Sequence, residues 1–246
     1  MKLNYNEIYN LDVFDFLKFI ENNSVDLAII DPPYNLKIAD WDTFLTLDDF
    51  LKFSYKWIDE VLLKLKPNGS FYIFNTPFNN ALFLNYLQNK SCYFKNWITW
   101  HKKDGFANAK KKYNNASESI LFYTMHDKKY TFNADSIRVE YESKERIEHA
   151  LKKGILKNGK RWYPNPNGKL CTEVWGITSQ KHKEKINGKT QKQKHPTIKP
   201  YEMIKRMVLA SSNEHDVVLD LFAGSGIGLK VCQDLNRLYL GTDINY

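Results

Sequence analysis

Apolar residues in this sequence fall into short continuous runs, separated by stretches with helical periodicity. Three runs, VDLAII (25–30), SFYIFN (70–75) and VVLDLF (217–222), have the length of a strand and carry no regular polar alternation. Such runs are typical of strands buried on both faces, as in a parallel sheet. Less regular apolar runs predict four further strands, at residues 8–9, 95–100, 118–124 and 237–243.

Apolar residues at helical spacing predict helices between these strands. Pro67-Asn68-Gly69 predicts a turn directly before the strand at 70–75. This order of elements predicts the α/β class, with a mostly parallel, seven-stranded, Rossmann-like sheet and helices on both of its faces. The helices are expected at 13–21, 47–66, 79–90 and 201–211, with a short one directly after Gly226.

The composition excludes several classes of protein. The 246-residue chain is 43% apolar and 15% aromatic, which is enough to bury a core, so a disordered chain is excluded. No stretch approaches the roughly 18 consecutive apolar residues of a membrane-spanning helix, and the N-terminus has no apolar segment of the secretory kind. Cys92, Cys171 and Cys232 are too far apart in sequence for zinc spacing or a disulfide framework. We therefore expect a protein of the reducing cytoplasm, with neither a membrane segment nor a metal site.

Positive charge is concentrated in one part of the chain. Residues 101–200 contain 23 Lys and Arg against 10 Asp and Glu, whereas the other 146 residues contain 13 against 18. Clear periodicity is also lost between 130 and 194. We expect a catalytic domain formed by residues 1–125 and 195–246, with an inserted basic recognition region at 126–194. A basic region on a mildly acidic body indicates a polyanionic partner such as nucleic acid, although a solvated lysine-rich surface has the same composition.

The first candidate site is a glycine-rich turn where a strand meets a helix. Asp220-Leu221-Phe222-Ala223-Gly224-Ser225-Gly226 follows a buried run, and its glycines let a ligand approach the backbone closely. Asp243 ends the next strand, where a carboxylate can accept hydrogen bonds from the two hydroxyls of a ribose. The run lacks the third glycine of the NAD fingerprint at its usual offset, which disfavours a nicotinamide-dependent dehydrogenase. A tight turn without a ligand is the alternative for this loop alone.

A more specific signal is Asp31-Pro32-Pro33-Tyr34, directly after the strand at 25–30. The two prolines stop the strand and prevent a helix from following, which leaves a carboxylate and main-chain carbonyls as acceptors. An exocyclic amine has two N–H donors that match such acceptors, and Tyr34 offers an aromatic face to a planar base. The alternative is a proline turn with a capping aspartate. Because ligands of parallel sheets bind beyond the carboxyl ends of the strands, we expect Asp31, Asp220 and Asp243 around one cleft.

Together these motifs resemble those of the DNA amino-methyltransferases. Asp31-Pro32-Pro33-Tyr34 is similar to the catalytic motif of that family, and residues 220–226 are similar to its S-adenosylmethionine loop. His195-Pro196-Thr197-Ile198-Lys199-Pro200 resembles the segment that precedes this loop. The catalytic motif comes first and the cofactor loop last, which is the circularly permuted order of the β class. Residues 70–194 further resemble adenine methyltransferases of restriction–modification systems.

The resemblance implies S-adenosylmethionine as the methyl donor, no metal, and catalytic roles for Asp31, Pro32, Pro33 and Tyr34. Asp31 and a main-chain carbonyl, that of Pro32, are implied to accept hydrogen bonds from the target amine of a flipped base, with Tyr34 stacked on that base. Aspartate at the first position accompanies adenine N6 in this family, whereas serine accompanies cytosine N4. The residues implied to bind the cofactor are Asp12, Val13, Asp31, His195, Thr197, Lys199, Asp220, Phe222, Ala223, Gly224, Ser225, Gly226 and Asp243.

Within that set the resemblance assigns different parts of the cofactor. Asp12 and Val13 match the position that contacts the adenine, and Asp243 the one at the ribose hydroxyls. His195, Thr197 and Lys199 are implied to lie near the methionine carboxylate. The structural alternatives are an ordinary loop histidine at His195, a surface charge at Lys199 and a helix N-cap at Asp12.

The implied partner is double-stranded DNA, bound by the basic region. Family chains continue into a further helix that covers one face of the sheet, whereas this sequence stops three residues after Asp243. A partner subunit, as in a homodimer, and a truncated chain are the two explanations. A cognate restriction endonuclease acting on the same site is a further implied partner. The open alternatives are a cytosine-N4 or RNA amino-methyltransferase and a catalytically silent nucleic-acid-binding subunit. Side chains of types suited to base edges are Arg138, Arg146, Arg161, Asn165 and Asn167.

Overall fold

The structure, a computed structural model, describes residues 2–102, 109–179, 183–186, 189–192 and 198–246. The strands of its main sheet are β1 (Glu7–Tyr9), β2 (Val25–Ile30), β3 (Leu65–Asn75), β4 (Tyr93–His101), β5 (Ser117–Thr124), β8 (Val174–Gly176), β11 (Val217–Asp220) and β12 (Leu238–Thr242). The α-helices are α1 (Val13–Leu17), α2 (Leu47–Lys64), α3 (Pro77–Leu87), α4 (Lys144–Lys153), α5 (Tyr201–Ser211) and α6 (Ile227–Asp234). Two short 3₁₀ helices are η1 (Asp40–Asp42) and η2 (Ala134–Ile137). Two small hairpins pair β6 (Ile155–Lys157) with β7 (Lys160–Trp162), and β9 (Lys183–Ile186) with β10 (Lys189–Lys192).

The main sheet has the strand order β1-β12-β11-β2-β3-β5-β4-β8. Neighbouring strands are parallel except at β5, which runs antiparallel to both β3 and β4. The mostly parallel α/β sheet is therefore confirmed, and all seven predicted strands are present. The number of strands was wrong, because β8 adds an eighth strand beside β4. With three residues, of which only Trp175 is buried, β8 is too short to give a hydrophobic pattern.

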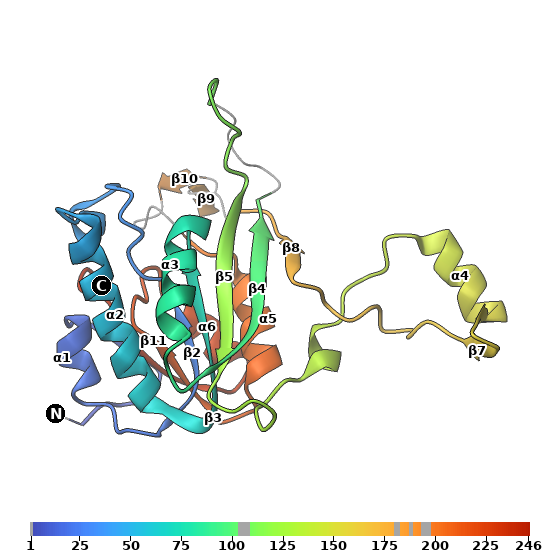
Figure 1. The fold of residues 1–246 in the computed structure, drawn as a ribbon, viewed down its shortest axis with the longest axis horizontal. Coiled ribbons are helices and arrows are strands. Elements are labelled where there is room, and N and C mark those ends of the chain that lie inside the picture. Colours follow the sequence, from blue (N-terminus) through green and yellow to red (C-terminus); the bar gives the residue numbers. More distant parts are fainter. Residues whose placement is uncertain (1, 103–108, 180–182, 187–188, 193–197) are drawn as a thin grey trace.

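Helices cover both faces of the sheet, as Figure 1 shows. Side chains of α1, α2 and α3 pack with Ala28 and Ile30 on one face, and side chains of α5 and α6 pack with Leu27 and Ile29 on the other. The continuous apolar run of β2 is thus buried on both sides, as its pattern predicts. Large side chains fill the two layers: Phe16, Phe50, Trp57 and Phe83 in the first, and Met203, Met207 and Val231 in the second.

Two local predictions shift in the structure. The turn expected at Pro67-Asn68-Gly69 is a bulge inside β3, since Val25 of β2 pairs with Leu65 and Leu27 already pairs with Ser70. Pro67 has no N–H to give to the ladder, so these residues leave the regular pairing. Helix α3 begins at Pro77 instead of 79, because the Thr76 hydroxyl accepts a hydrogen bond from Asn79 N (3.2 Å) and caps it.

Residues 125–179, the continuously described part of the chain between β5 and α5, do not form one compact body (Figure 1). Its first part is tied to α5 by Asn133, whose Nδ2 lies 3.1 Å from the carbonyl oxygens of both Leu209 and Ser212. An arm that carries α4 and the β6–β7 hairpin then projects away from the sheet. Strand β8 returns to the sheet, although it lies inside the range expected to be inserted. In the part of the chain that the structure describes, no helix has the length and apolar character needed to cross a membrane.

Candidate active site

The carboxyl ends of the parallel strands meet at one edge of the sheet, and a cavity of about 560 Å³ opens there. Asp12 follows β1, Asp31 follows β2, Asp220 ends β11 and Asp243 follows β12, so the fold itself gathers four carboxylates. Gly226 stands beside the cavity as the N-cap of α6, while His195 and Thr197 lie outside the described residues. The expected site residues that line the cavity are Asp12, Val13, Asp31, Pro32, Pro33, Tyr34, Lys199, Asp220, Phe222, Ala223, Gly224, Ser225 and Asp243.

The glycine turn is shaped by left-handed backbone and by one aspartate. Gly224 and Gly226 have φ angles of 49° and 75°, a region that favours glycine. Gly224 N donates to Asp243 Oδ2 at 2.9 Å, and Gly226 N donates to the Ala223 carbonyl at 2.9 Å. Asp243 therefore braces the turn, and it also lines the cavity.

Asp220 is a half-buried carboxylate that lines the cavity. Its Oδ2 accepts from the Tyr239 hydroxyl at 3.1 Å and its Oδ1 accepts from Phe222 N at 3.2 Å. Burial raises the pKa of Asp220 to about 7, and the negative charges of Asp31 and Asp243 add to this rise. A cationic ligand in the cavity would favour the ionised form. The electrostatics of this wall thus fit a positively charged ligand.

Two residues of the expected site also have structural duties. Asp12 Oδ1 accepts from Phe14 N at 2.8 Å, so Asp12 is the helix N-cap of α1 that was the alternative for this residue. Asp12 also lines the cavity. The Phe222 ring packs against Phe53 and Trp57, with ring centres 6.4 and 6.0 Å away. Phe222 and Phe53 line the cavity and give it an apolar wall beside its carboxylates, while Trp57 supports Phe222 from the core.

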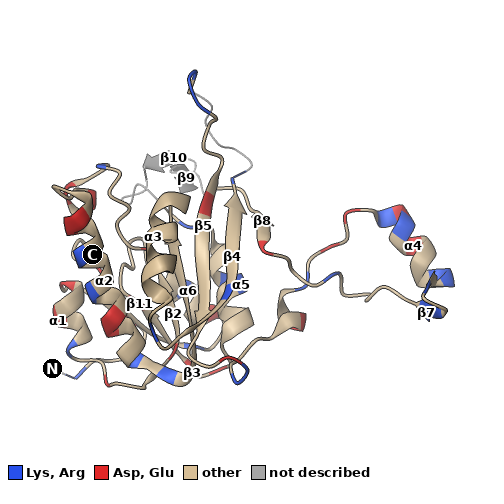
Figure 2. Cartoon of the chain, viewed as in Figure 1, with Lys and Arg blue, Asp and Glu red and all other residues tan. Residues whose placement is uncertain are grey.

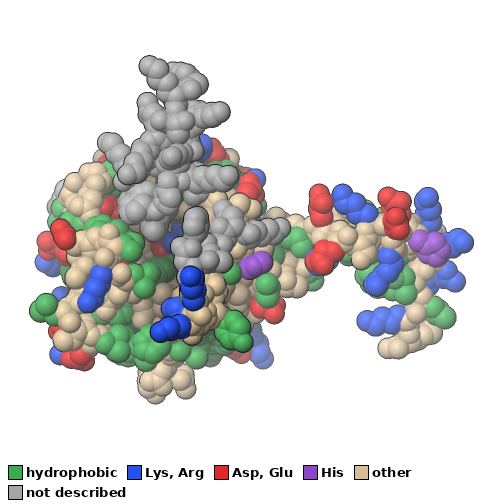
Figure 3. All heavy atoms as spheres, turned by 90° about the horizontal axis from the view of Figure 1, so that it is seen from above, with side chains coloured by type: hydrophobic (Ala, Val, Ile, Leu, Met, Phe, Trp, Pro, Cys, Tyr) green, Lys and Arg blue, Asp and Glu red, His purple; other side chains and the backbone are tan. Residues whose placement is uncertain are grey.

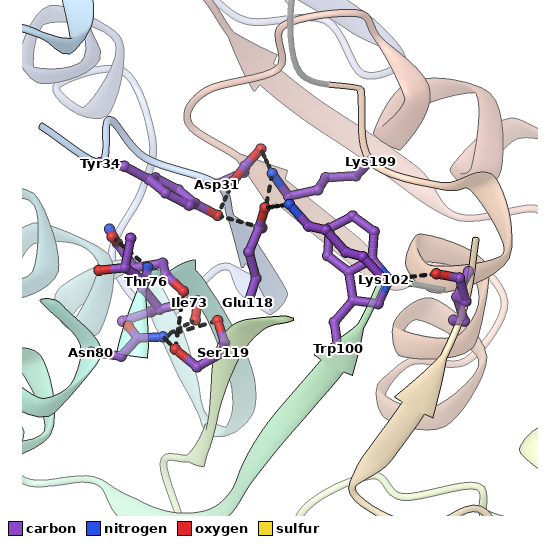
Figure 4. Close-up of polar contacts among 12 residues, drawn as sticks. Asp31, Tyr34, Ile73, Thr76, Asn80, Trp100, Lys102, Glu118, Ser119 and Lys199 are labelled. Atoms are coloured by element: carbon purple, nitrogen blue, oxygen red, sulfur yellow. Dashed lines mark hydrogen bonds and ion pairs between the residues drawn. The ribbon is translucent and has the colours of Figure 1, made fainter. Parts of the chain in front are cut away.

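Asp31, which follows the strand next to that of Asp220, lies in a cluster of charged groups (Figure 4). Lys199 Nζ is 2.7 Å from Asp31 Oδ2, so the structure places this lysine at the aspartate, whereas the resemblance implied the methionine carboxylate. The Tyr34 hydroxyl lies 3.0 Å from Asp31 Oδ1 and 3.1 Å from Glu118 Oε2. Glu118 also forms an ion pair with Lys102. Tyr34 and Lys199 thus contact the Asp31 carboxylate directly, and Glu118 is linked to it through both of them.

The loop after the two prolines is held by Asp42, which is fully buried. Its Oδ1 accepts from Tyr34 N (2.5 Å) and Asn35 N (2.9 Å). Its Oδ2 accepts from Leu36 N (2.8 Å) and Ile38 N (3.4 Å). One carboxylate therefore fixes the backbone that positions Tyr34.

Asn79 supports the same loop from α3. Its Nδ2 donates to the Tyr34 carbonyl at 2.9 Å, and Asn75 Nδ2 lies 3.5 Å from the Pro33 carbonyl. The main chain of the proline turn is thus hydrogen-bonded to the end of β3 and the start of α3. This bonding holds the turn rigid at the mouth of the cavity.

Sequence reasoning missed Asp42, Glu118 and Lys102. Glu118 is the second residue of β5, and a parallel β5 would have placed it at the opposite edge of the sheet. Because β5 is antiparallel, its first residues lie at the cavity, next to Lys102 at the end of β4. A charged residue at the start of an otherwise buried strand was the available signal. Among the described residues, no three His, Cys, Asp or Glu side chains are grouped as a metal site requires.

Comparison with known proteins extends these observations. A sequence model of a family described as DNA methylase matches residues 25–246. The Type II methyltransferase M1.MboII of Moraxella bovis is 55% identical over 243 residues, which are 99% of this chain and 93% of that protein. The DNA adenine methyltransferase YhdJ of Escherichia coli (strain K12) is 34% identical, covering 95% of this chain and 76% of that protein.

Two solved structures share the fold. The cytosine-N4-specific PvuII DNA methyltransferase has a TM-score of 0.72 at 13% identity, covering 99% of this chain and 83% of that one. An M1.HpyAVI–SAM complex has a TM-score of 0.60 at 23% identity, and the match covers 96% of this chain and 92% of that one. The extent of the family match and the identity to M1.MboII decide the assignment. The chain belongs to the DNA methylase family, and it is a DNA methyltransferase that uses S-adenosylmethionine as its methyl donor.

Proposed function

We propose that this enzyme methylates the N6 amino group of adenine at a specific site in duplex DNA, with Asp31 as the residue that receives the amine. The observation that carries the proposal is the position of the Asp31 carboxylate, which lines the same cavity as Asp220, Asp243 and the glycine turn. The adenine specificity printed for YhdJ supports the same target. Cytosine N4 is the competing target, because the PvuII enzyme has the same fold.

The methyl donor is proposed to lie over the glycine turn. S-adenosylmethionine supplies an electrophilic methyl group on a positively charged sulfur. Asp220 and Asp243 provide negative charge along one wall, and the open backbone at Gly224 and Gly226 allows close approach. Asp12 and Val13 line the cavity beside the end of β12, where they suit the adenine end of a nucleoside. Apolar side chains such as Phe222 exclude water from this part of the cavity.

The target amine is proposed to bind at Asp31. An adenine amino nitrogen is a weak nucleophile, because its lone pair is delocalised into the ring. A hydrogen bond from that amine to Asp31 Oδ1, and a second to the Pro32 carbonyl, favour the tetrahedral nitrogen and stabilise the positive charge that develops on it. The amine nitrogen gains the methyl group as the carbon–sulfur bond breaks, and its extra proton then passes to the Asp31 carboxylate or to water. The base must leave the duplex stack to reach this cavity, which costs a few kcal/mol, and the Tyr34 ring is the surface proposed to stack on it.

DNA is proposed to lie against the basic loop and the basic arm. Lys110, Lys111 and Lys112 are exposed on the loop between β4 and β5, which projects from the cavity edge of the sheet (Figure 2). Residues 144–163 of the arm contain seven Lys and Arg against two Glu. Basic side chains of the arm reach into solvent beside the body (Figure 3). Phosphate contacts of this kind supply affinity and position, and they carry no sequence information directly.

Some of the residues proposed for base recognition already bond other groups within the protein. Arg138 Nε bonds Asp135 Oδ1 at 2.7 Å and its Nη1 bonds the Gly168 carbonyl at 2.8 Å, which fastens the base of the arm. Asn165 Oδ1 accepts from Asn167 N at 2.9 Å within a turn. The Arg161 guanidinium donates to the Lys153 carbonyl. Arg146 and the side chain of Asn167, both exposed, are the candidates that these contacts leave for base edges.

We propose two protein partners: a second copy of this chain, which would form a homodimer, and a cognate restriction endonuclease that acts on the same site. Sedimentation velocity at several protein concentrations tests the dimer. Resistance of DNA from expressing cells to the endonuclease tests the second partner. An RNA substrate or a catalytically silent subunit would instead give no methylation of duplex DNA.

The experiment on the proposed chemistry is Asp31→Ala. Methylation of duplex DNA should be lost, because no carboxylate receives the amine, while calorimetry should still detect S-adenosylmethionine binding, since the glycine turn is unchanged. Turnover near that of the wild type would refute the role of Asp31. Loss of cofactor binding along with activity would show that Asp31 serves the donor instead of the target.

A further inference from the structure

Glu118 and Lys199 form a buried ion pair directly beside Asp31 (Figure 4). The Lys199 side chain is 8% exposed, and its Nζ lies 2.7 Å from Asp31 Oδ2 and 3.6 Å from Glu118 Oε2. The ammonium group is also 5.3 Å from the ring centres of both Tyr34 and Phe74. Lys199 is therefore enclosed by carboxylates and aromatic faces, which fix its position.

The cluster is balanced in charge. Burial alone would raise the pKa of Glu118, but the ammonium groups of Lys199 and Lys102 outweigh burial and lower that pKa below its usual value. Burial alone would lower the pKa of Lys199, but Asp31 and Glu118 outweigh it and raise that pKa. Both members of the pair are thus charged at neutral pH. Buried charges persist only when they are paired in this way.

Glu118 also gives the Tyr34 hydroxyl a second acceptor. The hydroxyl has one proton and lies at hydrogen-bonding distance from Asp31 Oδ1 (3.0 Å) and Glu118 Oε2 (3.1 Å). When an amine approaches Asp31 Oδ1, the Tyr34 proton can turn fully to Glu118. No buried donor is then left without a partner, so the change carries no desolvation penalty.

We propose that Glu118 and Lys199 are positioning residues for the methyl-transfer reaction, which hold Asp31 by Oδ2 and leave Oδ1 to the target amine. Lys199 fixes the rotation of the carboxylate, and Glu118 holds Lys199 and accepts the hydrogen bond of the Tyr34 hydroxyl. This inference rests on the proposed role of Asp31. It assigns a function to Lys199 that differs from contact with the methyl donor.

The test is Glu118→Gln, which keeps the size of the side chain and removes its charge. The variant should lower kcat on the order of 100-fold, because the reacting carboxylate loses its fixed orientation. The dissociation constant of S-adenosylmethionine, measured by calorimetry, should change less than about threefold, since the glycine turn is untouched. Glu118→Asp, which keeps the charge on a shorter side chain, should recover part of the rate.

The pH dependence of kcat gives a readout that a purely structural role would not change. The titratable groups facing Lys199 are Asp31, Glu118 and Tyr34, with Lys102 on the far side of Glu118. In Glu118→Gln only one counter-charge remains, so Lys199 loses its proton at lower pH. The alkaline limb of the profile should therefore move to lower pH than in the wild type.

Asp26→Asn is the matched control, because Asp26 lies at the other end of β2 and pairs with Lys66 at 2.8 Å. It should lower stability and leave kcat unchanged. Wild-type kcat in Glu118→Gln would overturn the inference, and if that variant does not fold, wild-type kcat in Lys199→Gln, which removes the ammonium group from Asp31 Oδ2, would overturn it equally. Asp31→Ala distinguishes failure of the proposed function from failure of this inference. Retained methylation in Asp31→Ala would refute the proposed function. Lost methylation in Asp31→Ala together with full activity in Glu118→Gln would refute only the positioning role.

Discussion

Asp42→Asn is a sensitive test of how the loop at Tyr34 is held, because the substitution keeps the shape of the side chain. Both carboxylate oxygens of Asp42 accept two backbone N–H groups each. An amide offers only one oxygen, so either orientation turns a donor toward two N–H groups. With the oxygen kept at Tyr34, the 2.8 Å bond from Leu36 N is lost, together with the weaker 3.4 Å bond from Ile38 N.

The magnitude follows from the strength of such bonds. A hydrogen bond to a charged group contributes about 1.5–3 kcal/mol, and the long bond contributes less, so the ordered loop should lose about 2–4 kcal/mol. That loss corresponds to a shift of about 30- to 700-fold in the equilibrium between the ordered and the open loop. Because the loop is local, the global melting temperature should fall less than this figure suggests.

Hydrogen exchange read by mass spectrometry measures the loop directly. Amides of residues 34–38 should exchange faster in Asp42→Asn, and kcat for DNA methylation should fall with them. Asp40→Asn, two residues earlier and exposed, is the control and should change neither. Unaltered exchange at 34–38 in Asp42→Asn would refute the reasoning.

Three further predictions concern the cofactor and DNA. Gly224→Val should weaken S-adenosylmethionine binding about tenfold or more, because φ at Gly224 is 49°, a region that valine rarely adopts. Gly159→Val is the control, because Gly159 also has a positive φ but lies in the arm, and it should leave the affinity unchanged. Equal calorimetric affinities of the two variants would contradict this prediction. Asp220, with a pKa of about 7, is neutral below that pH and ionised above it. Affinity for the cationic cofactor should therefore rise about tenfold from pH 6 to pH 8, and this pH dependence should disappear in Asp220→Asn. A slope that persists in Asp220→Asn would assign the effect to another group. Replacing the lysines at 110–112 by glutamine should reduce the salt dependence of log K for duplex DNA by about 2–3, for specific and non-specific sites alike. An unchanged slope would remove these lysines from the DNA face.

The sequence predicted the parts of the structure that depend on local pattern. Seven strands, the helices of the body and the carboxylates at strand ends were all visible in continuous apolar runs followed by Asp31, Asp220 and Asp243. Strand direction was not visible, because two hydrophobic runs look the same whether they pair parallel or antiparallel. Glu118 was missed for that reason, since only an antiparallel β5 brings it to the cavity.

Other features depend on contacts between distant segments. The role of Asp42 requires a loop that folds back on it, and nothing in its immediate sequence distinguishes it from the exposed Asp40. The ion pair between Lys199 and Asp31 joins residues 168 positions apart. Helix α4 of the arm was not predicted, because it packs little against the rest of the protein and Ala150 is its one buried residue.

The identity of the methylated base tests the central claim most directly. Duplex DNA treated with the enzyme and methyl-deuterated S-adenosylmethionine can be digested to nucleosides and analysed by mass spectrometry. The account predicts labelled N6-methyladenine as the product, and its absence when the same experiment is run with Asp31→Ala. Labelled N4-methylcytosine, or label in RNA alone, would contradict it.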